Sequence, residues 1–243
     1  MYPTHNESFR IKSYEVDFAD KLKLSSLFLF FQESAYNHAE SYGLGYNGLK
    51  EKGLFWVLSR IKVNLFAYPL ERDLIRIETW PKGVSRLAAF RDFQVTDEAG
   101  RLLIAVTSQW LVLDVATKRP RRVEFLPQLL PIYEGKEAIV DELEKLHSPG
   151  ELEHCHDKRA AASDVDINRH VNNAKYIDWI TDCFSLEELE RRPIRSLQVN
   201  YLAEVGYGEE VAIRRGRETD GRTYIEGMKQ GAGAVAFNAL IEF

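Results

Sequence analysis

Polar side chains that could take part in catalysis are concentrated in one stretch of this sequence, Ser163-Asp164-Val165-Asp166-Ile167-Asn168-Arg169-His170-Val171-Asn172-Asn173. The stretch holds two aspartates, three asparagines and one histidine. Four of its polar side chains occupy every second position, namely Asp164, Asp166, Asn168 and His170. Alternate side chains of an extended segment point the same way, so an extended conformation would let these four line one wall.

An apolar pattern with helical spacing follows directly and predicts a helix over residues 171–184. We expect Asn172 or Asn173 to cap this helix rather than to bind a ligand, and Tyr176 and Trp179 to lie in the core. The unpaired backbone N–H groups of the helix N-terminus would lie beside the polar wall. A base, an amide and a helix N-terminus in one place are what acyl transfer requires. The bland alternative is a capping turn with solvated polar residues, and for Asp164 a turn-forming role competes with a catalytic one.

The composition is that of an ordinary globular protein, with 45% hydrophobic and 28% charged residues among 243. A net charge of −5 provides no basic field for nucleic acid. Two cysteines, Cys155 and Cys183, exclude a disulfide framework and fit a reducing compartment. Residues 1–8 lack the features of a secretory signal, and the apolar run at 27–31 is far shorter than the ~20 residues of a membrane span. We therefore expect a cytoplasmic protein.

Hydrophobic periodicity predicts two α+β units, each with a long helix and an antiparallel sheet wrapped on it. The first, residues 1–130, would contain a helix at 24–42 and strands at 8–17, 55–65, 74–80, 88–96 and 102–114. A linker at 131–150 would contain a charged helix at 134–147. The second unit, residues 151–243, would contain strands at 153–160, 194–201, 209–215, 223–229 and 232–243 around the 171–184 helix.

Two segments of the first unit match the second at the level of residues. Residues 17–26 align with 164–173, and 61–67 align with 197–203. In this alignment the positions of Asp166, Asn168 and His170 are occupied by alanine and two lysines at 19, 21 and 23. The first copy therefore has no imidazole or amide for chemistry, and we expect it to be a binding half.

The pattern Asp-x-Asp-x-x-x-His-Val-Asn-Asn-x-x-Tyr before a long helix resembles the hot-dog thioesterase superfamily. The doubled arrangement, with the motif in the second copy only, resembles the acyl-acyl-carrier-protein thioesterases of plants and bacteria over nearly the whole chain. The most specific parts are residues 166–176 and the later Tyr201-Leu-Ala-Glu-Val-Gly206. The resemblance implies a tandem hot-dog fold and hydrolysis of fatty acyl-ACP, with no cofactor and no metal. It also implies that the N-terminal copy shapes the acyl pocket.

The resemblance places the catalytic residues at Asp166, Asn168, His170 and Glu204. Glu204 or His170 would be the general base, Asn168 would polarise the thioester carbonyl, and Asp166 would orient His170 or Asn168. In plant members a cysteine follows the glutamate, whereas this chain has Val205, so a Cys–His mechanism is not available at this position.

The remaining candidates concern partners. The basic run Lys118, Arg119, Arg121 and Arg122 could be solvated surface or a docking patch for an acidic acyl carrier protein. His154 and His156 would share one strand face, but no third and fourth ligands accompany them, which argues against a metal site. The alternatives to an acyl-ACP thioesterase are an acyl-CoA thioesterase of the same fold and a non-catalytic acyl-binding or sensor module. A monomer and a homodimer are both compatible with a tandem repeat.

Overall fold

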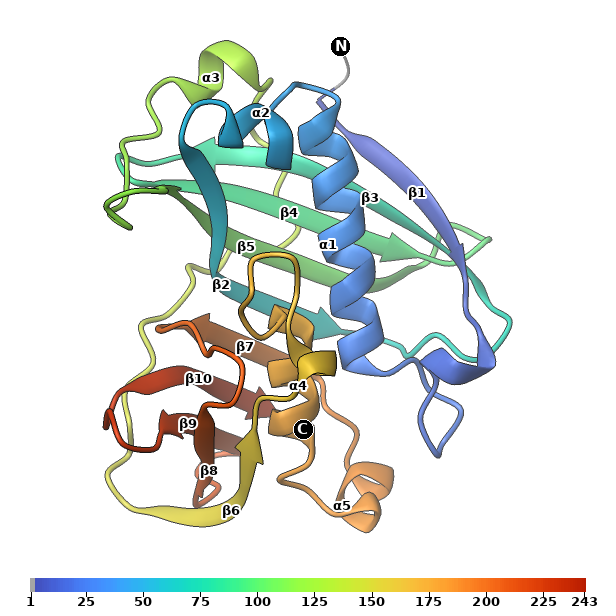
Figure 1. Cartoon of the computed structure of the whole chain (residues 1–243). Coiled ribbons are helices and arrows are strands. Elements are labelled where there is room, and N and C mark those ends of the chain that lie inside the picture. The colour runs from blue at the N-terminus through green and yellow to red at the C-terminus, as the bar shows by residue number, and fades with distance from the viewer. Residues whose placement is uncertain (1–2) are drawn as a thin grey trace. The chain divides into compact units, whose positions relative to one another are not determined.

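The computed structural model describes residues 3–243. The chain forms two compact units, Met1–Leu143 and Glu144–Phe243, and the division falls inside the predicted linker. Each unit combines one antiparallel sheet with one main helix (Figure 1). In the described part of the chain, no helix is both long enough and apolar enough to span a bilayer.

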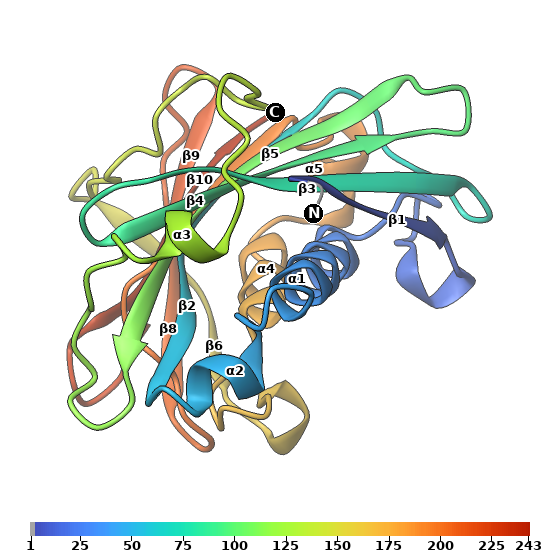
Figure 2. The ribbon, with the colours of Figure 1, turned by 90° about the horizontal axis from the view of Figure 1, so that it is seen from above.

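The sheet of the first unit has the strand order β1-β3-β4-β5-β2, with every neighbouring pair antiparallel. Its elements are β1 (His5–Arg10), α1 (Leu24–Glu40), α2 (Tyr46–Lys50), β2 (Leu54–Leu65), β3 (Leu74–Val84), β4 (Ala88–Thr96), β5 (Leu102–Asp114) and α3 (Leu126–Leu129). Helix α1 crosses the strands of this sheet (Figure 1) and lies on one side of them (Figure 2). It buries Leu24, Leu27, Phe28, Phe31 and Ala35, whose spacing confirms the predicted helical stripe.

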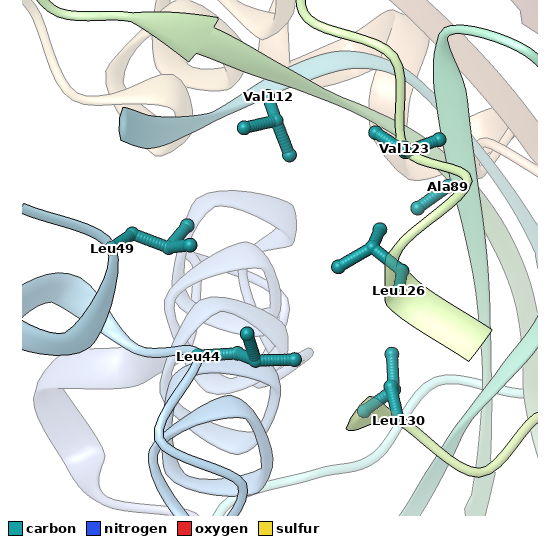
Figure 3. Close-up of a cluster of buried hydrophobic side chains, with 7 residues drawn as sticks. All are labelled: Leu44, Leu49, Ala89, Val112, Val123, Leu126 and Leu130. Atoms are coloured by element: carbon teal, nitrogen blue, oxygen red, sulfur yellow. The ribbon is translucent and has the colours of Figure 1, made fainter. Parts of the chain in front are cut away.

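A second apolar cluster in this unit was not predicted. Leu49 of α2 and Leu126 of α3 point toward one another and toward Val112 of β5 (Figure 3). Leu44, Ala89, Val123 and Leu130 complete the cluster, and all seven residues are buried. The cluster fastens two short helices, which are too short to be stable alone, onto the sheet.

The second unit has the strand order β7-β10-β9-β8-β6, also antiparallel throughout. Its elements are β6 (Leu152–Arg159), α4 (Asn173–Thr181), α5 (Leu186–Arg191), β7 (Ser196–Tyr201), β8 (Glu210–Gly216), β9 (Arg222–Lys229) and β10 (Val235–Glu242). Tyr176 and Trp179 of α4 are buried, as predicted, and the Tyr176 ring packs edge-on against Phe237 of β10. Gly227 of β9 is required here because the Phe237 ring occupies the space that a Cβ would need.

The charged helix predicted over 134–147 is absent, and the segment is irregular. Side chains of the first sheet form hydrogen bonds with backbone carbonyl and N–H groups of this segment, which would otherwise pair within a helix. Trp80 Nε1 donates to the Lys136 carbonyl (2.9 Å), and Asp92 Oδ2 accepts the Ala138 N–H (2.7 Å). Ile139 is also buried in the unit. Tertiary contacts therefore outweigh the helical propensity of this stretch.

Helix α5 was missed by the sequence analysis, although its sequence carries a start signal. Ser185 accepts the backbone N–H of Glu188, and Glu188 reaches back to the N–H of Ser185 (2.8 Å). This is the reciprocal capping box that Ser-x-x-Glu encodes.

Candidate active site

The polar stretch forms a tight hairpin turn rather than the extended wall we expected. The Asp166 N–H donates to the His170 carbonyl at 2.9 Å, and Val165 pairs with Val171 across the turn. Arg169 adopts the left-handed conformation, with φ 64°. Asp166 Oδ1 accepts the Asn168 N–H at 2.8 Å, which is how an aspartate stabilises a turn of this kind. Alternation breaks at the turn, so the four polar side chains do not line one wall.

The turn brings His170 to the loop that connects β7 and β8. The Val171 N–H donates to the Val205 carbonyl at 2.8 Å, and His170 forms an isolated bridge with Gly206. These contacts place His170 Nε2 3.1 Å from Glu204 Oε2. The two side chains are 33% and 44% exposed, so both can be reached from solvent. The structure thus unites the predicted imidazole and the predicted carboxylate.

The other two predicted catalytic residues lie in the same turn. Asp166 was expected to orient His170 or Asn168, and it contacts the backbone of both. Its carboxylate accepts the Asn168 N–H, and its own N–H donates to the His170 carbonyl. Asn168 is exposed at the tip. Asp166 therefore holds the loop in shape, and the Asn168 side chain is left exposed to solvent.

Asp164 has the turn-forming role that competed with catalysis. Its Oδ2 accepts the Ala161 N–H at 2.9 Å, and its carbonyl accepts the Asn172 N–H at 2.8 Å. Asn172 is the N-cap of α4, as predicted, and its Oδ1 accepts the Ala174 N–H at 2.9 Å. The Asn173 carbonyl accepts a hydrogen bond from the Tyr201 hydroxyl. The Ala174 N–H at the helix N-terminus is therefore satisfied by the Asn172 side chain and does not face a ligand.

We expect Asn172→Ala to destabilise the protein by about 1 kcal/mol, the usual cost of losing an N-cap side chain. Thermal unfolding followed by circular dichroism measures this. Asn168→Ala is the matched control, because Asn168 is exposed in the same loop and supports the turn through its backbone. Equal stability of Asn172→Ala and the wild type would contradict the capping role.

Both halves of the chain match models of one protein family. Residues 3–126 match the acyl-ACP thioesterase N-terminal domain, and residues 149–242 match the acyl-ACP thioesterase C-terminal domain. The chain belongs to the acyl-ACP thioesterase family. The predicted family and its α+β tandem hot-dog fold are thereby confirmed.

Relatives and solved structures agree with this membership. A chloroplastic palmitoyl-acyl carrier protein thioesterase of Gossypium hirsutum is 30% identical over 83% of this chain and 52% of its own length. The chain thus spans about half the length of the curated relatives it matches. An acyl-ACP thioesterase structure from Bacteroides thetaiotaomicron is 26% identical, with a TM-score of 0.84 over 99% of this chain and 98% of that one. The 12:0-ACP thioesterase of Umbellularia californica, 23% identical, shares the fold with a TM-score of 0.85 over 100% and 97%.

The first unit contains the same hairpin turn in degenerate form. The Asp17 N–H donates to the Lys21 carbonyl at 2.8 Å, and the Leu22 N–H donates to the Pro69 carbonyl at 2.8 Å. Asp20 is left-handed, with φ 60°, as Arg169 is in the second unit. These matching contacts make Asp17 the counterpart of Asp166, so the alignment of residues 17–26 with 164–173 was wrong by two residues. The sequence match favoured Asp164, whereas the turn itself is built on Asp166.

In the corrected register the first copy keeps the aspartate, as Asp17, but lacks the other three predicted catalytic side chains. The positions of Asn168, His170 and Glu204 are taken by Ala19, Lys21 and Tyr68. In place of an imidazole–carboxylate contact, Lys21 Nζ lies 5.6 Å from the centre of the Tyr68 ring. The predicted amide, imidazole and carboxylate side chains therefore occur together in the second unit and not at the equivalent positions of the first.

The two remaining sequence candidates are the basic run after β5 and the two histidines of β6. All of Lys118, Arg119, Arg121 and Arg122 are exposed after β5, and Lys118 Nζ sits 4.7 Å from the centre of the Phe55 ring. Arg121 lies only 4.0 Å from Asp114, so its charge is partly offset. In β6, a bulge between His154 and His156 breaks the alternation, so the expectation that both imidazoles share one strand face is wrong.

Proposed function

We propose that this protein hydrolyses the thioester of fatty acyl-acyl carrier protein to free fatty acid and acyl carrier protein. The observation that carries the proposal is the 3.1 Å contact between His170 Nε2 and Glu204 Oε2 in the second unit of a chain of this family. An imidazole and a carboxylate in direct contact form one acid–base unit, which can accept a proton from water and return it to a leaving group.

The reaction uses this pair twice. A water molecule attacks the thioester carbonyl carbon while its proton passes to the His170–Glu204 pair. The tetrahedral intermediate then collapses, the carbon–sulfur bond breaks, and the same proton neutralises the carrier thiolate. Asn168 is the side chain we assign to the developing oxyanion, because it is an exposed amide in the same turn as His170. Removal of one such donor typically reduces the rate about 100- to 1,000-fold.

The residues around the pair favour direct attack by water over a cysteine nucleophile. The residue after Glu204 is Val205, which is fully buried. Cys155 lies in β6, and Cys183 follows α4, where burial raises the pKa of its thiol and keeps it protonated. Neither thiol belongs to the loops that carry His170 and Glu204.

Exposed apolar side chains on the same two loops suit an acyl substrate. Ile167 lies in the hairpin turn between Asp166 and Asn168, and Leu202 and Tyr207 flank Glu204. Their exposures are 76%, 56% and 71%. The exposure of three large apolar side chains on these two loops supports a surface that an acyl ligand covers.

We further propose that the basic run at 118–122 docks the acidic carrier. Charge reversal at Arg121 and Arg122 together is expected to raise KM for acyl-ACP about 10-fold. Charged contacts at an interface affect how the carrier associates with the enzyme more than they affect the chemical step. KM for a small acyl thioester should stay unchanged. Steady-state kinetics on both substrates measures the effect, with Arg195→Glu as a control at another exposed arginine. An equal rise in KM for both substrates would contradict carrier docking.

The proposal is tested by incubating the purified protein with acyl-ACP and quantifying both products. Free fatty acid and free carrier thiol should appear in equal amounts. Hydrolysis of acyl-CoA alone would identify an acyl-CoA thioesterase of the same fold, and tight acyl binding without turnover would identify a sensor.

A further inference from the structure

Glu204 lies in a loop without regular structure, so its carboxylate needs a support that fixes it relative to His170. The loop connects β7 to β8 and begins with two N–H groups, those of Leu202 and Ala203, that both donate to the Ala236 carbonyl. This contact anchors the start of the loop to β10. It leaves the backbone of Glu204 itself to be held by other groups.

Lys229, the last residue of β9, supplies that support. Its Nζ donates to the Glu204 carbonyl at 2.9 Å and lies 2.8 Å from Glu209 Oε1. The other oxygen of this carboxylate, Glu209 Oε2, accepts the Gly206 N–H at 2.6 Å. Lys229 and Glu209 thus clamp the loop on both sides of Val205.

The electrostatics agree with a fixed contact rather than a mobile surface pair. Only 16% of the Lys229 side chain is exposed. The hydrogen bond from Lys229, followed by the one from the Gly206 N–H, lowers the pKa of Glu209 below its ordinary value. A carboxylate that stays ionised keeps the ammonium group of Lys229 in place against the Glu204 carbonyl.

The first unit provides an internal comparison that separates fold from function. There the Leu70 N–H donates to Asp73 Oδ2 at 2.9 Å, just as the Gly206 N–H donates to Glu209. The carboxylate cap therefore belongs to the fold. Ala212 of β8 pairs with Met228 of β9, and the residue equivalent to Ala212 in the first unit, Arg76 of β3, pairs with Thr96 of β4. Thr96 is therefore the counterpart of Met228, and the next residue, Asp97, is the counterpart of Lys229. The lysine occurs only in the unit that has the His–Glu pair.

We infer that Lys229 is a positioning residue for the reaction, and that it acts by fixing the backbone of Glu204 so that its carboxylate meets His170. This inference rests on the proposed function. Misplacement of a catalytic group by about 1 Å can cost on the order of 100-fold in rate. Lys229 touches the loop and not the reacting atoms, so its loss acts through Glu204.

The test compares Lys229→Met, which keeps the length and loses the donor, with Lys229→Arg, which restores a donor. Lys229→Met should lower kcat on acyl-ACP about 10- to 100-fold, with KM changed less than about two-fold, and Lys229→Arg should recover most of the loss. The matched control is Lys158→Met, which removes the Lys158–Asp182 pair (2.9 Å) from the same unit and should leave kcat unchanged.

Two further measurements separate the inference from the proposed function. In a Glu204→Gln background, Lys229→Met should cause no additional loss, because its target is already disabled. Imidazole ¹⁵N NMR of His170, assigned with His170→Ala, should lose the signature of the carboxylate contact in Lys229→Met even if acyl-ACP is not the substrate. Full kcat and an unchanged His170 spectrum in Lys229→Met would overturn the inference. Absence of hydrolysis by the wild type would instead overturn the proposed function.

Discussion

Replacement of His170 with alanine is expected to lower kcat on acyl-ACP about 1,000-fold, within the range that a positioned acid–base group contributes. The variant loses the imidazole whose Nε2 lies 3.1 Å from Glu204. It keeps the backbone contacts that build the turn, namely the His170 carbonyl to the Asp166 N–H and the bridge to Gly206. Because the side chain is one-third exposed, the free energy of unfolding should change by no more than about 0.5 kcal/mol.

The control for this variant is His154→Ala. His154 Nε2 lies 3.1 Å from Asp157 Oδ1, so the same unit contains a second imidazole–carboxylate contact of equal length. His154→Ala should retain wild-type kcat. Single-turnover release of labelled fatty acid measures both variants. Activity of His170→Ala within a few-fold of the wild type would show that the imidazole has no part in the chemistry.

Glu204→Gln is expected to lower kcat about 100- to 1,000-fold while preserving the shape of the side chain. Glutamine cannot accept the proton or stabilise a protonated imidazole, whichever member of the pair is the base. The loop should keep its conformation, because the support from Lys229 reaches the Glu204 carbonyl and not its carboxylate. KM for acyl-ACP should change little, since the carrier contacts elsewhere remain.

The double variant His170→Ala/Glu204→Gln tests whether the two residues act as one unit. Groups that share one task are strongly non-additive, so the double variant should be no slower than His170→Ala alone. Asp157→Asn, which alters the control pair in β6, should have full activity. Losses that multiply would show that His170 and Glu204 act in separate steps.

Local patterns in the sequence were sufficient for the α+β architecture of both units, although not for every element. The buried stripe of α1 has the spacing of a helix. Asn172 is the N-cap of α4, and asparagine is a preferred N-cap residue because its side-chain oxygen accepts a backbone N–H. The family resemblance selected the residues of the His170–Glu204 pair. Their direct contact depends on two backbone pairings between distant loops, which no local pattern encodes.

The errors have physical causes of the same kind. Residues 134–147 have helical periodicity, but Trp80 and Asp92 bind their backbone and hold them irregular. The polar residues at 164–170 alternate like a strand, but the Asp166 side chain caps a turn in the middle of them. Lys229 lies far from Glu204 in the sequence, and nothing in its neighbourhood marks it. The cytoplasmic location and the choice between monomer and homodimer stay predictions.

The central claim is that the His170–Glu204 pair releases fatty acid from acyl carrier protein. The most direct test measures free fatty acid released by the wild type and by His170→Ala from acyl-ACP and acyl-CoA, each loaded with matched chains from C8 to C18. We expect release from acyl-ACP to exceed release from acyl-CoA, to peak at particular chain lengths and to be lost in His170→Ala. Preferential release from acyl-CoA, or release from acyl-ACP that persists in His170→Ala, would contradict the account.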